Sequence, residues 1–260
     1  MPINTLVDYW YTNINGDSEV AWQWRASNTT AVTNTSGSIT SSVSANTTAG
    51  FSIVTYSGNA SVATVGHGLG ATPKMIIVKQ RNAAGNYFVV WFSGATNANQ
   101  SLWLGATNSV LSTPNYWGGS TPTSSVFSVG NDSATNGSGS TYVAYCWSEI
   151  ASFSKLGTFT GNGSSDGPFI YCGFRPRFLL IRRSTNIANW VIWDAARAPY
   201  NQVKAQLFPN TSDAEDSTGE CDFLSNGFKI RGTNVTWNGS GDTIIYAAFA
   251  ESPFNYSLAR

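Results

Sequence analysis

A six-residue pattern, Asn-Gly-Ser-Gly-x-Thr, occurs twice in this chain and constrains its fold more than any other feature. It begins at Asn136 and again at Asn238. Each copy leads into an apolar run that is followed by a glutamate, Glu149 in the first copy and Glu251 in the second. The pattern and the glutamate recur at one spacing (238 − 136 = 102). The sequence therefore predicts the closing strand of a domain that the chain contains twice.

Other matches between the two parts occur at a spacing of 103 residues. Gly58-Asn59, Pro73 and Asn86-Tyr87 have the counterparts Gly161-Asn162, Pro176 and Asn189-Trp190. The same spacing aligns His67 with Ile170. It changes to 101 at Phe127 and Phe228, so the length differences lie between about residues 92 and 136. We expect function where the copies disagree, in residues 93–125 and 195–226.

Short apolar runs bounded by Gly, Asn and Pro are typical of β-strands. In the first copy we expect strands at 51–56, 62–65, 74–79, 87–92, 102–104, 126–129 and 142–147, and the second copy repeats this order. About 100 residues with six or seven strands is the size of a β-sandwich. We therefore predict an all-β chain of two tandem β-sandwiches, residues 51–152 and 153–260, packed tightly together. The Asn-Gly-Ser-Gly segments are predicted hairpin turns that set strand register.

Composition supports the all-β prediction and limits the partners. Charged residues make up 11% of the chain, against about 25% in an ordinary soluble domain, while there are ten Trp. The formal net charge is zero, which argues against nucleic acid as a partner. There is no signal-peptide pattern and no apolar run long enough for membrane insertion. The three cysteines cannot all pair, and we expect them to be reduced.

Residues 1–50 differ from the rest because Asn, Ser and Thr dominate them. Only residues 20–25 alternate well enough for a strand. The segment is either a flexible leader or an extended N-terminal arm that orders against a neighbouring subunit. Trp10, Trp22 and Trp24 favour the arm, because exposed Trp is costly without a partner. We therefore expect this segment to mediate assembly.

The residues offer little catalytic chemistry, and we predict no enzyme, no cofactor and no metal. The single histidine, His67, lies in a glycine-rich loop. Glu149 and Glu251 suit a carboxylate pair for glycoside hydrolysis, but their duplicated position favours a structural role, in which each glutamate bonds backbone donors or an arginine of its own copy. The acidic residues 213–216 suit calcium or a solvated loop. Asp194 and Arg197 suit a local ion pair.

Aromatic residues in predicted loops are the best candidates for surface contacts. They are Trp103, Tyr116, Trp117 and Trp237. An aromatic ring covers the apolar face of a sugar while neighbouring amides bond its hydroxyls. The same residues also serve as core or subunit-interface anchors, where Trp and Tyr are enriched.

Several motifs carry a resemblance to a known family. They include residues 20–24 (Val-Ala-Trp-Gln-Trp), 66–70 (Gly-His-Gly-Leu-Gly), 171–176 (Tyr-Cys-Gly-Phe-Arg-Pro), 224–229 (Leu-Ser-Asn-Gly-Phe-Lys) and 246–254 (Tyr-Ala-Ala-Phe-Ala-Glu-Ser-Pro-Phe). Over residues 20–260 the chain resembles an uncharacterised tandem β domain of marine and cyanobacterial phage virion proteins, often found at the C-terminus of predicted tail-fibre proteins. The resemblance implies a virion component and supplies no catalytic residues.

The expected function is that of a bacteriophage tail or tail-fibre component, assembled in the host cytoplasm and carried in the virion. Its partners would be other virion proteins, further copies of itself (a trimer is favoured) and a glycan or protein of the host surface. The alternatives are a capsid decoration protein and, more remotely, a glycan-active enzyme.

Overall fold

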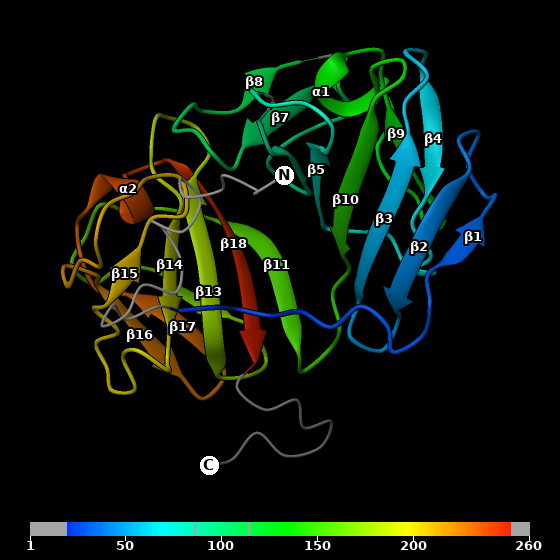
Figure 1. The fold of residues 1–260 in the computed structure, drawn as a ribbon. Coiled ribbons are helices and arrows are strands. Elements are labelled where there is room, and N and C mark those ends of the chain that lie inside the picture. The colour runs from blue at the N-terminus through cyan, green and yellow to red at the C-terminus, as the bar shows by residue number, and fades with distance from the viewer. Residues whose placement is uncertain (1–19, 86, 114, 251–260) are drawn as a thin grey trace, which may run out of the picture.

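The computed structural model describes residues 20–85, 87–113 and 115–250. Within these ranges the chain forms eighteen β-strands and two helices of four residues each, α1 (Ser133–Asn136) and α2 (Val235–Asn238). The prediction of an all-β fold is confirmed. Figure 1 shows two groups of strands, one built by the earlier part of the chain and one by the later part.

The first group contains an eight-stranded antiparallel sheet and a small two-stranded sheet. From edge to edge the large sheet consists of β1 (Val32–Asn34), β2 (Ser41–Asn46), β3 (Phe51–Ser57), β10 (Thr141–Trp147), β5 (Met75–Gln80), β6 (Val89–Phe92), β7 (Gln100–Trp103) and β8 (Leu111–Ser112). The small sheet pairs β4 (Ala63–Gly66) with β9 (Val126–Val129).

The second group contains a five-stranded sheet and a three-stranded sheet. The first consists of β11 (Ser154–Thr160), β18 (Thr243–Ala250), β13 (Pro176–Arg183), β14 (Val191–Asp194) and β15 (Gln206–Leu207). The second consists of β12 (Phe169–Tyr171), β17 (Gly227–Ile230) and β16 (Cys221–Leu224). The two large sheets have matching strand orders. The order β3-β10-β5-β6-β7 in the first group corresponds to β11-β18-β13-β14-β15 in the second.

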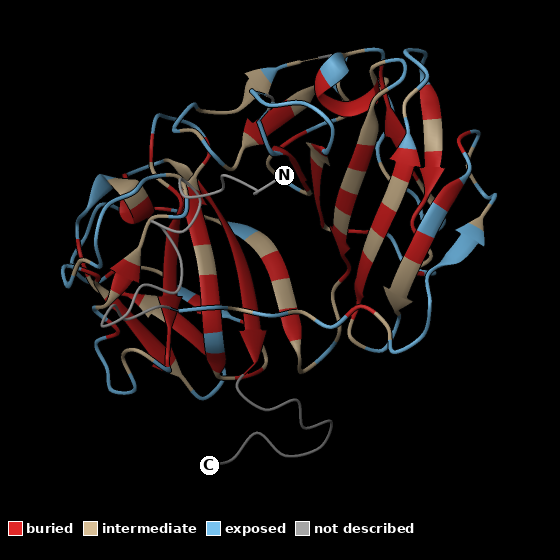
Figure 2. Ribbon diagram, in the orientation of Figure 1, coloured by how far each residue is buried: buried red, intermediate tan, exposed pale blue. Residues whose placement is uncertain are grey.

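The two large sheets are buried on both faces, which explains why their central strands are continuously apolar. Successive side chains of a strand point to opposite faces. In β10, Tyr142, Ala144 and Cys146 belong to a core shared with β4 and β9, whereas Trp147 belongs to a core shared with the second group. In β18, alternate residues likewise divide between the second group's own core and the shared core. Figure 2 shows the resulting buried residues along both central sheets.

The molecule therefore has three cores rather than the two of independent sandwiches. The shared core lies between the two large sheets and includes Phe51, Met75 and Phe92 of one group and Phe178, Ile192 and Phe249 of the other. Burial of apolar area is the main stabilising term in folding. Packing between the two groups is thus part of the folding energy of this chain.

Residues 20–50 do not form an arm separate from the body, contrary to expectation. β2 pairs with β3 along its whole length, from Ser41 opposite Tyr56 to Asn46 opposite Phe51, and β1 pairs with β2. Residues 20–25, predicted as a strand, have no strand structure. They instead cross from the second group of strands to the first as an extended strap (Figure 1).

The interpretation of the Asn-Gly-Ser-Gly segments as hairpin turns is wrong. β9 belongs to the small sheet and β10 to the large one, so the first segment joins two sheets. Asn136 ends α1 and is fully buried. Its side-chain Oδ1 accepts from the Asn59 backbone N–H (2.9 Å), and its Nδ2 donates to the carbonyls of Ser61 (2.6 Å) and Gly130 (2.7 Å).

Asn238 makes the same three hydrogen bonds in the second group. It accepts from the Asn162 N–H (2.9 Å) and donates to the carbonyls of Ser164 (2.8 Å) and Gly232 (2.7 Å). Each asparagine is itself buried and satisfies backbone groups of two separate loops, of which those of Gly130 and Gly232 lie in buried residues. This role, and not register, requires an amide with both a donor and an acceptor at this position.

Candidate functional site

Trp22 and Trp24 of the strap pack inside this chain. The Trp24 ring lies edge-on to Phe178 (5.2 Å between centroids), Phe249 (5.3 Å) and Trp147 (6.2 Å). Trp22 contacts Phe178 at 5.6 Å, and the Arg197 guanidinium lies 5.8 Å from the Trp22 ring. The strap therefore seals one side of the shared core. Trp10, the third residue expected in the assembly arm, lies outside the described residues.

A cavity of about 630 Å³ lies between the two large sheets, beside the strap. Its lining includes Phe51, Met75 and Tyr145 on one side and Phe178, Leu180 and Phe249 on the other. Among the described residues that line it, only Gln23 has a side chain that is neither apolar nor aromatic. A space with so few hydrogen-bonding groups suits apolar groups and disfavours a sugar or a peptide backbone.

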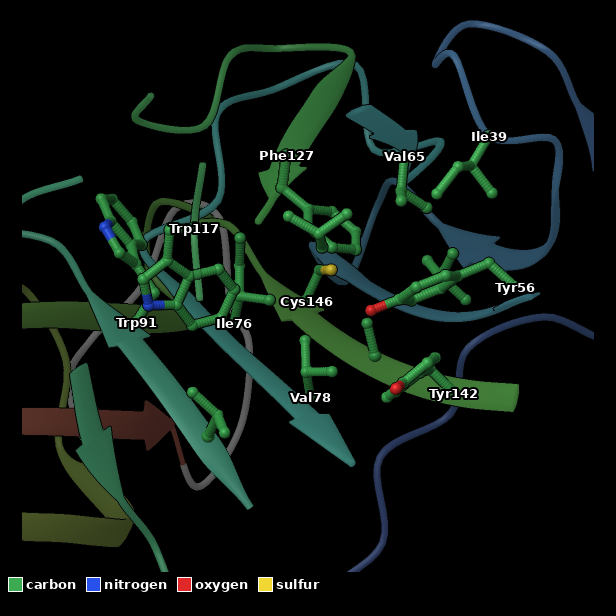
Figure 3. Packing of buried hydrophobic residues seen from close by; sticks show 14 of the residues in the cluster. Ile39, Tyr56, Val65, Ile76, Val78, Trp91, Trp117, Phe127, Tyr142 and Cys146 are labelled. Carbon is green, nitrogen blue, oxygen red and sulfur yellow. The ribbon is translucent and has the colours of Figure 1, made fainter. Parts of the chain in front are cut away.

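Two of the four predicted surface aromatics are core residues, so that part of the prediction is wrong. Trp117 and Trp237 are each only 2% exposed. The Trp117 indole N–H donates to Ser101 Oγ at 2.9 Å, and Figure 3 shows this ring beside Trp91 in the core of the first group. Trp237, in α2, packs edge-on against Trp193 at 5.3 Å. Neither ring is available for a ligand.

Trp103 and Tyr116 do lie at the surface, together with a residue that sequence reasoning missed. Tyr87 stacks on Trp103 with ring centroids 4.2 Å apart and planes 4° from parallel. Tyr87 is 46% exposed, whereas Trp103 and Tyr116 are partly buried against the core of the first group. We call Tyr87, Trp103 and Tyr116 the aromatic platform. The sequence carried no signal for this exposure, since the run 87–92 is continuously apolar, whereas Tyr87 and Phe88 both precede β6 and are both exposed.

The surroundings of Tyr116 hold the platform in place. The Tyr116 carbonyl accepts from Gly130 N–H (2.9 Å) and Thr135 Oγ1 (2.8 Å), which fixes it against the segment that leads into α1. Partial burial raises the pKa of the Tyr116 hydroxyl, and the Asp132 carboxylate adds to this increase. The Asp132 N–H donates to the Asn115 carbonyl (3.3 Å), so Asp132 lies beside Tyr116. The platform presents flat aromatic surface beside a hydrogen-bond donor and an anionic acceptor.

The second group has no equivalent platform. Strand pairing places Asn189 at the position of Tyr87, because Val89 pairs with Val78 and Val191 pairs with Ile181, the residue that matches Val78. The spacing at this strand is therefore 102 and not the predicted 103. Trp190, which follows Asn189, is 1% exposed and donates its indole N–H to the Trp103 carbonyl at 2.8 Å. In the same register Phe208 takes the position of Trp103, because Leu102 pairs with Val90 and Leu207 pairs with Ile192, the residue that matches Val90. The platform therefore belongs to one group of strands only.

Arg182 joins the platform to the second group of strands. This buried side chain on β13 donates to the carbonyls of Trp103 (3.0 Å) and Asn108, and its guanidinium lies 5.0 Å from the Trp190 ring. Burial lowers the pKa of Arg182 to about 10. Arg182 and Trp190 together bind the backbone at Trp103, so the contact between the groups supports the platform from behind.

His67 is a structural residue. It is fully buried, its Nδ1 accepts from the Leu69 N–H (3.2 Å) and its Nε2 lies 3.2 Å from the Thr123 carbonyl. Desolvation by burial lowers its pKa. Both ring nitrogens are therefore occupied by the backbone, and the ring has no acid–base role at a surface.

The alignment of His67 with Ile170 is wrong by two residues. The His67 N–H donates to the Ser125 carbonyl (3.2 Å), and the Cys172 N–H donates to the Asn226 carbonyl (2.9 Å) at the equivalent place. Cys172 therefore occupies the position of His67. A constant spacing missed this because the loop before each strand differs in length.

Glu149 bonds the backbone, as one of its two interpretations predicted. Its Oε1 accepts from the Leu156 N–H at 2.9 Å, and Lys155 Nζ lies 3.4 Å from the carboxylate. Glu251 lies outside the described residues. No pair of catalytic carboxylates is formed by Glu149 within the described part of the chain.

The predicted ion pair between Asp194 and Arg197 is confirmed, with Arg197 Nε 2.6 Å from Asp194 Oδ2. In the acidic segment, Asp216 bonds Gln206 and Thr218. Across residues 20–85, 87–113 and 115–250, no three His, Cys, Asp or Glu side chains come together as a metal site requires.

The three cysteines are free and buried, as expected. Burial raises the pKa of the Cys146 and Cys172 thiols to about 12, and it raises that of Cys221 as well. These thiols are therefore neutral packing groups. Neither helix within the described ranges is long enough to cross a membrane.

The described part of the chain is thus an all-β body whose first group of strands carries the aromatic platform. The chain belongs to a family described as a domain of unknown function (DUF7483), whose model matches residues 5–253. Comparison with curated proteins and with solved structures finds no match.

Proposed function

We propose that this chain is a structural protein of a bacteriophage particle, a tail or tail-fibre component that contacts the host surface. The observation that carries the proposal is the aromatic platform, because exposed Tyr and Trp rings are favoured contact groups at protein interfaces. Trp103 and Tyr116 lie in residues 93–125, where the two copies differ in sequence and a specific function is expected. The sequence resemblance to phage virion domains supports the same proposal.

Self-association is part of the proposal, with a trimer favoured. β12 is an edge strand, and its Phe169 and Tyr171 are 44% and 64% exposed on one face. An edge strand with exposed aromatic side chains is a natural surface for contact with another chain. Light scattering of the purified chain tests this, since a monomer at all concentrations would exclude it.

Labelling of intact particles with an antibody against this chain tests the proposed location. Label at the tail or its fibres is the expected result. Label spaced over the capsid lattice would replace the proposal with the capsid decoration role, and absence from purified particles would refute both. Release of products from host polysaccharide, lost on Glu149→Gln, would instead establish a glycan-active enzyme.

A further inference from the structure

We infer that the aromatic platform is a carbohydrate-binding site in which the outer face of Tyr87 stacks on a pyranose ring. This inference deepens the proposed function and rests on it for the choice of the contact surface. It names the class of host molecule that the surface recognises. The argument depends on the geometry of the three rings and on the polar groups beside them.

The stacked rings leave one aromatic face free. Trp103 covers one face of Tyr87 at a centroid distance of 4.2 Å, and Tyr87 remains 46% exposed. The face of an aromatic ring carries partial negative charge, and the axial C–H hydrogens of a pyranose carry partial positive charge. The free face of Tyr87 therefore attracts the apolar face of a sugar.

Hydrogen bonds to the Trp103 backbone hold in place the residue on which Tyr87 stacks. The Trp103 backbone carbonyl accepts from Arg182 Nη1 (3.0 Å) and from Trp190 Nε1 (2.8 Å), so its position is fixed by the second group of strands. A group that is already ordered loses little conformational entropy on binding. Tyr200, which is 82% exposed, has no stacked ring beneath it among the described residues and offers a control of the same side chain.

Polar groups next to the rings distinguish a sugar from an apolar ligand. Asp132 lies beside Tyr116, because the Asp132 N–H donates to the Asn115 carbonyl (3.3 Å), and its Oδ1 accepts from the Ala134 N–H (2.8 Å). A protonated hydroxyl donates one hydrogen bond, and a carboxylate accepts several. Sugar hydroxyls use this combination at the rim of a stacking ring, whereas a lipid chain would form hydrogen bonds with neither group. The cavity between the sheets is the opposite case, with almost no polar lining.

Glycan binding by the purified full-length chain tests the inference. Oligosaccharides built on glucose, galactose and N-acetylglucosamine would be screened on an array, and the strongest titrated by calorimetry. We expect binding, a loss of roughly tenfold or more in Tyr87→Ala, and near-normal affinity in Tyr87→Phe, which retains the ring. Tyr200→Ala should bind like the wild type.

Two results would overturn the inference. One is that no glycan binds at millimolar concentration although the chain is folded by circular dichroism. The other is that Tyr87→Ala binds as tightly as the wild type. Neither measurement depends on where the chain lies in a particle, so a failure here is distinct from a failure of the particle labelling.

Discussion

Replacing Asn136 by alanine should destabilise the chain strongly, and the structure allows the size of the effect to be worked out. Alanine removes the partners of three backbone groups: the Asn59 N–H and the carbonyls of Ser61 and Gly130. An unsatisfied buried polar group costs about 1–3 kcal/mol. Of these three residues only Gly130 is buried, and water can reach Asn59 and Ser61, so we expect a loss of about 2–4 kcal/mol in the free energy of unfolding.

Urea unfolding followed by tryptophan fluorescence measures this loss, with the slope checked for a two-state transition. Asn238→Ala should lose a similar amount, because its three partners are equivalent. Asn136→Asp separates hydrogen bonding from packing, since a carboxylate fills the space but donates no bond to the two carbonyls. The exposed Asn28→Ala is the control. A loss below about 1 kcal/mol in Asn136→Ala, or a fully stable Asn136→Asp at pH 7, would refute the reasoning.

Three further predictions concern the contacts between the two groups of strands and the buried histidine. Trp24→Ala should lower the free energy of unfolding by about 2–4 kcal/mol, because it empties part of the shared core; an unchanged thermal midpoint would show that the strap packs only weakly. Arg182→Met should cost about 1–3 kcal/mol, because the Asn108 carbonyl loses its charged donor, and should speed hydrogen exchange in residues 104–110; unchanged exchange would argue against this clamp. The lowered pKa of His67 means that the unfolded chain binds a proton more readily than the folded chain below pH ~6.5. The contribution of His67 to stability should therefore be fully present above pH ~6.5 and fall as the pH drops toward the pKa of His67 in the folded chain. His67→Gln should weaken this pH dependence, which urea unfolding at pH 7.5 and 5.5 measures. An identical pH dependence in the variant would contradict the lowered pKa of His67.

Local patterns in the sequence predicted most strands, because alternation and punctuating Gly and Asn are properties of the strand itself. The run 51–56 became β3, and 74–79 with 87–92 became the hairpin of β5 and β6. The strap shows the limit of this reasoning. Residues 20–25 alternate like a strand, yet Trp22 and Trp24 pack between two sheets. Their ring partners there, Trp147, Phe178 and Phe249, lie more than a hundred residues away in the chain.

The candidate site shows the same limit. Trp117 lies in a polar, glycine-rich segment that is typical of an exposed loop, but its indole N–H finds Ser101 and its ring enters the core. Tyr87 was assigned to an apolar strand and is exposed. Which aromatic ring of a β protein is covered depends on the packing of distant elements. Trp190 is buried because it lies against the first group of strands, where its indole N–H bonds the Trp103 carbonyl.

Binding of the purified full-length chain to host cells tests the central claim most directly. The account predicts that fluorescently labelled chain binds the host of the phage, that it slows adsorption of that phage, and that Tyr87→Ala does neither while Tyr200→Ala does both. If the folded wild-type chain does not bind host cells, or if Tyr87→Ala binds them equally well, the aromatic platform is not a host-contact surface.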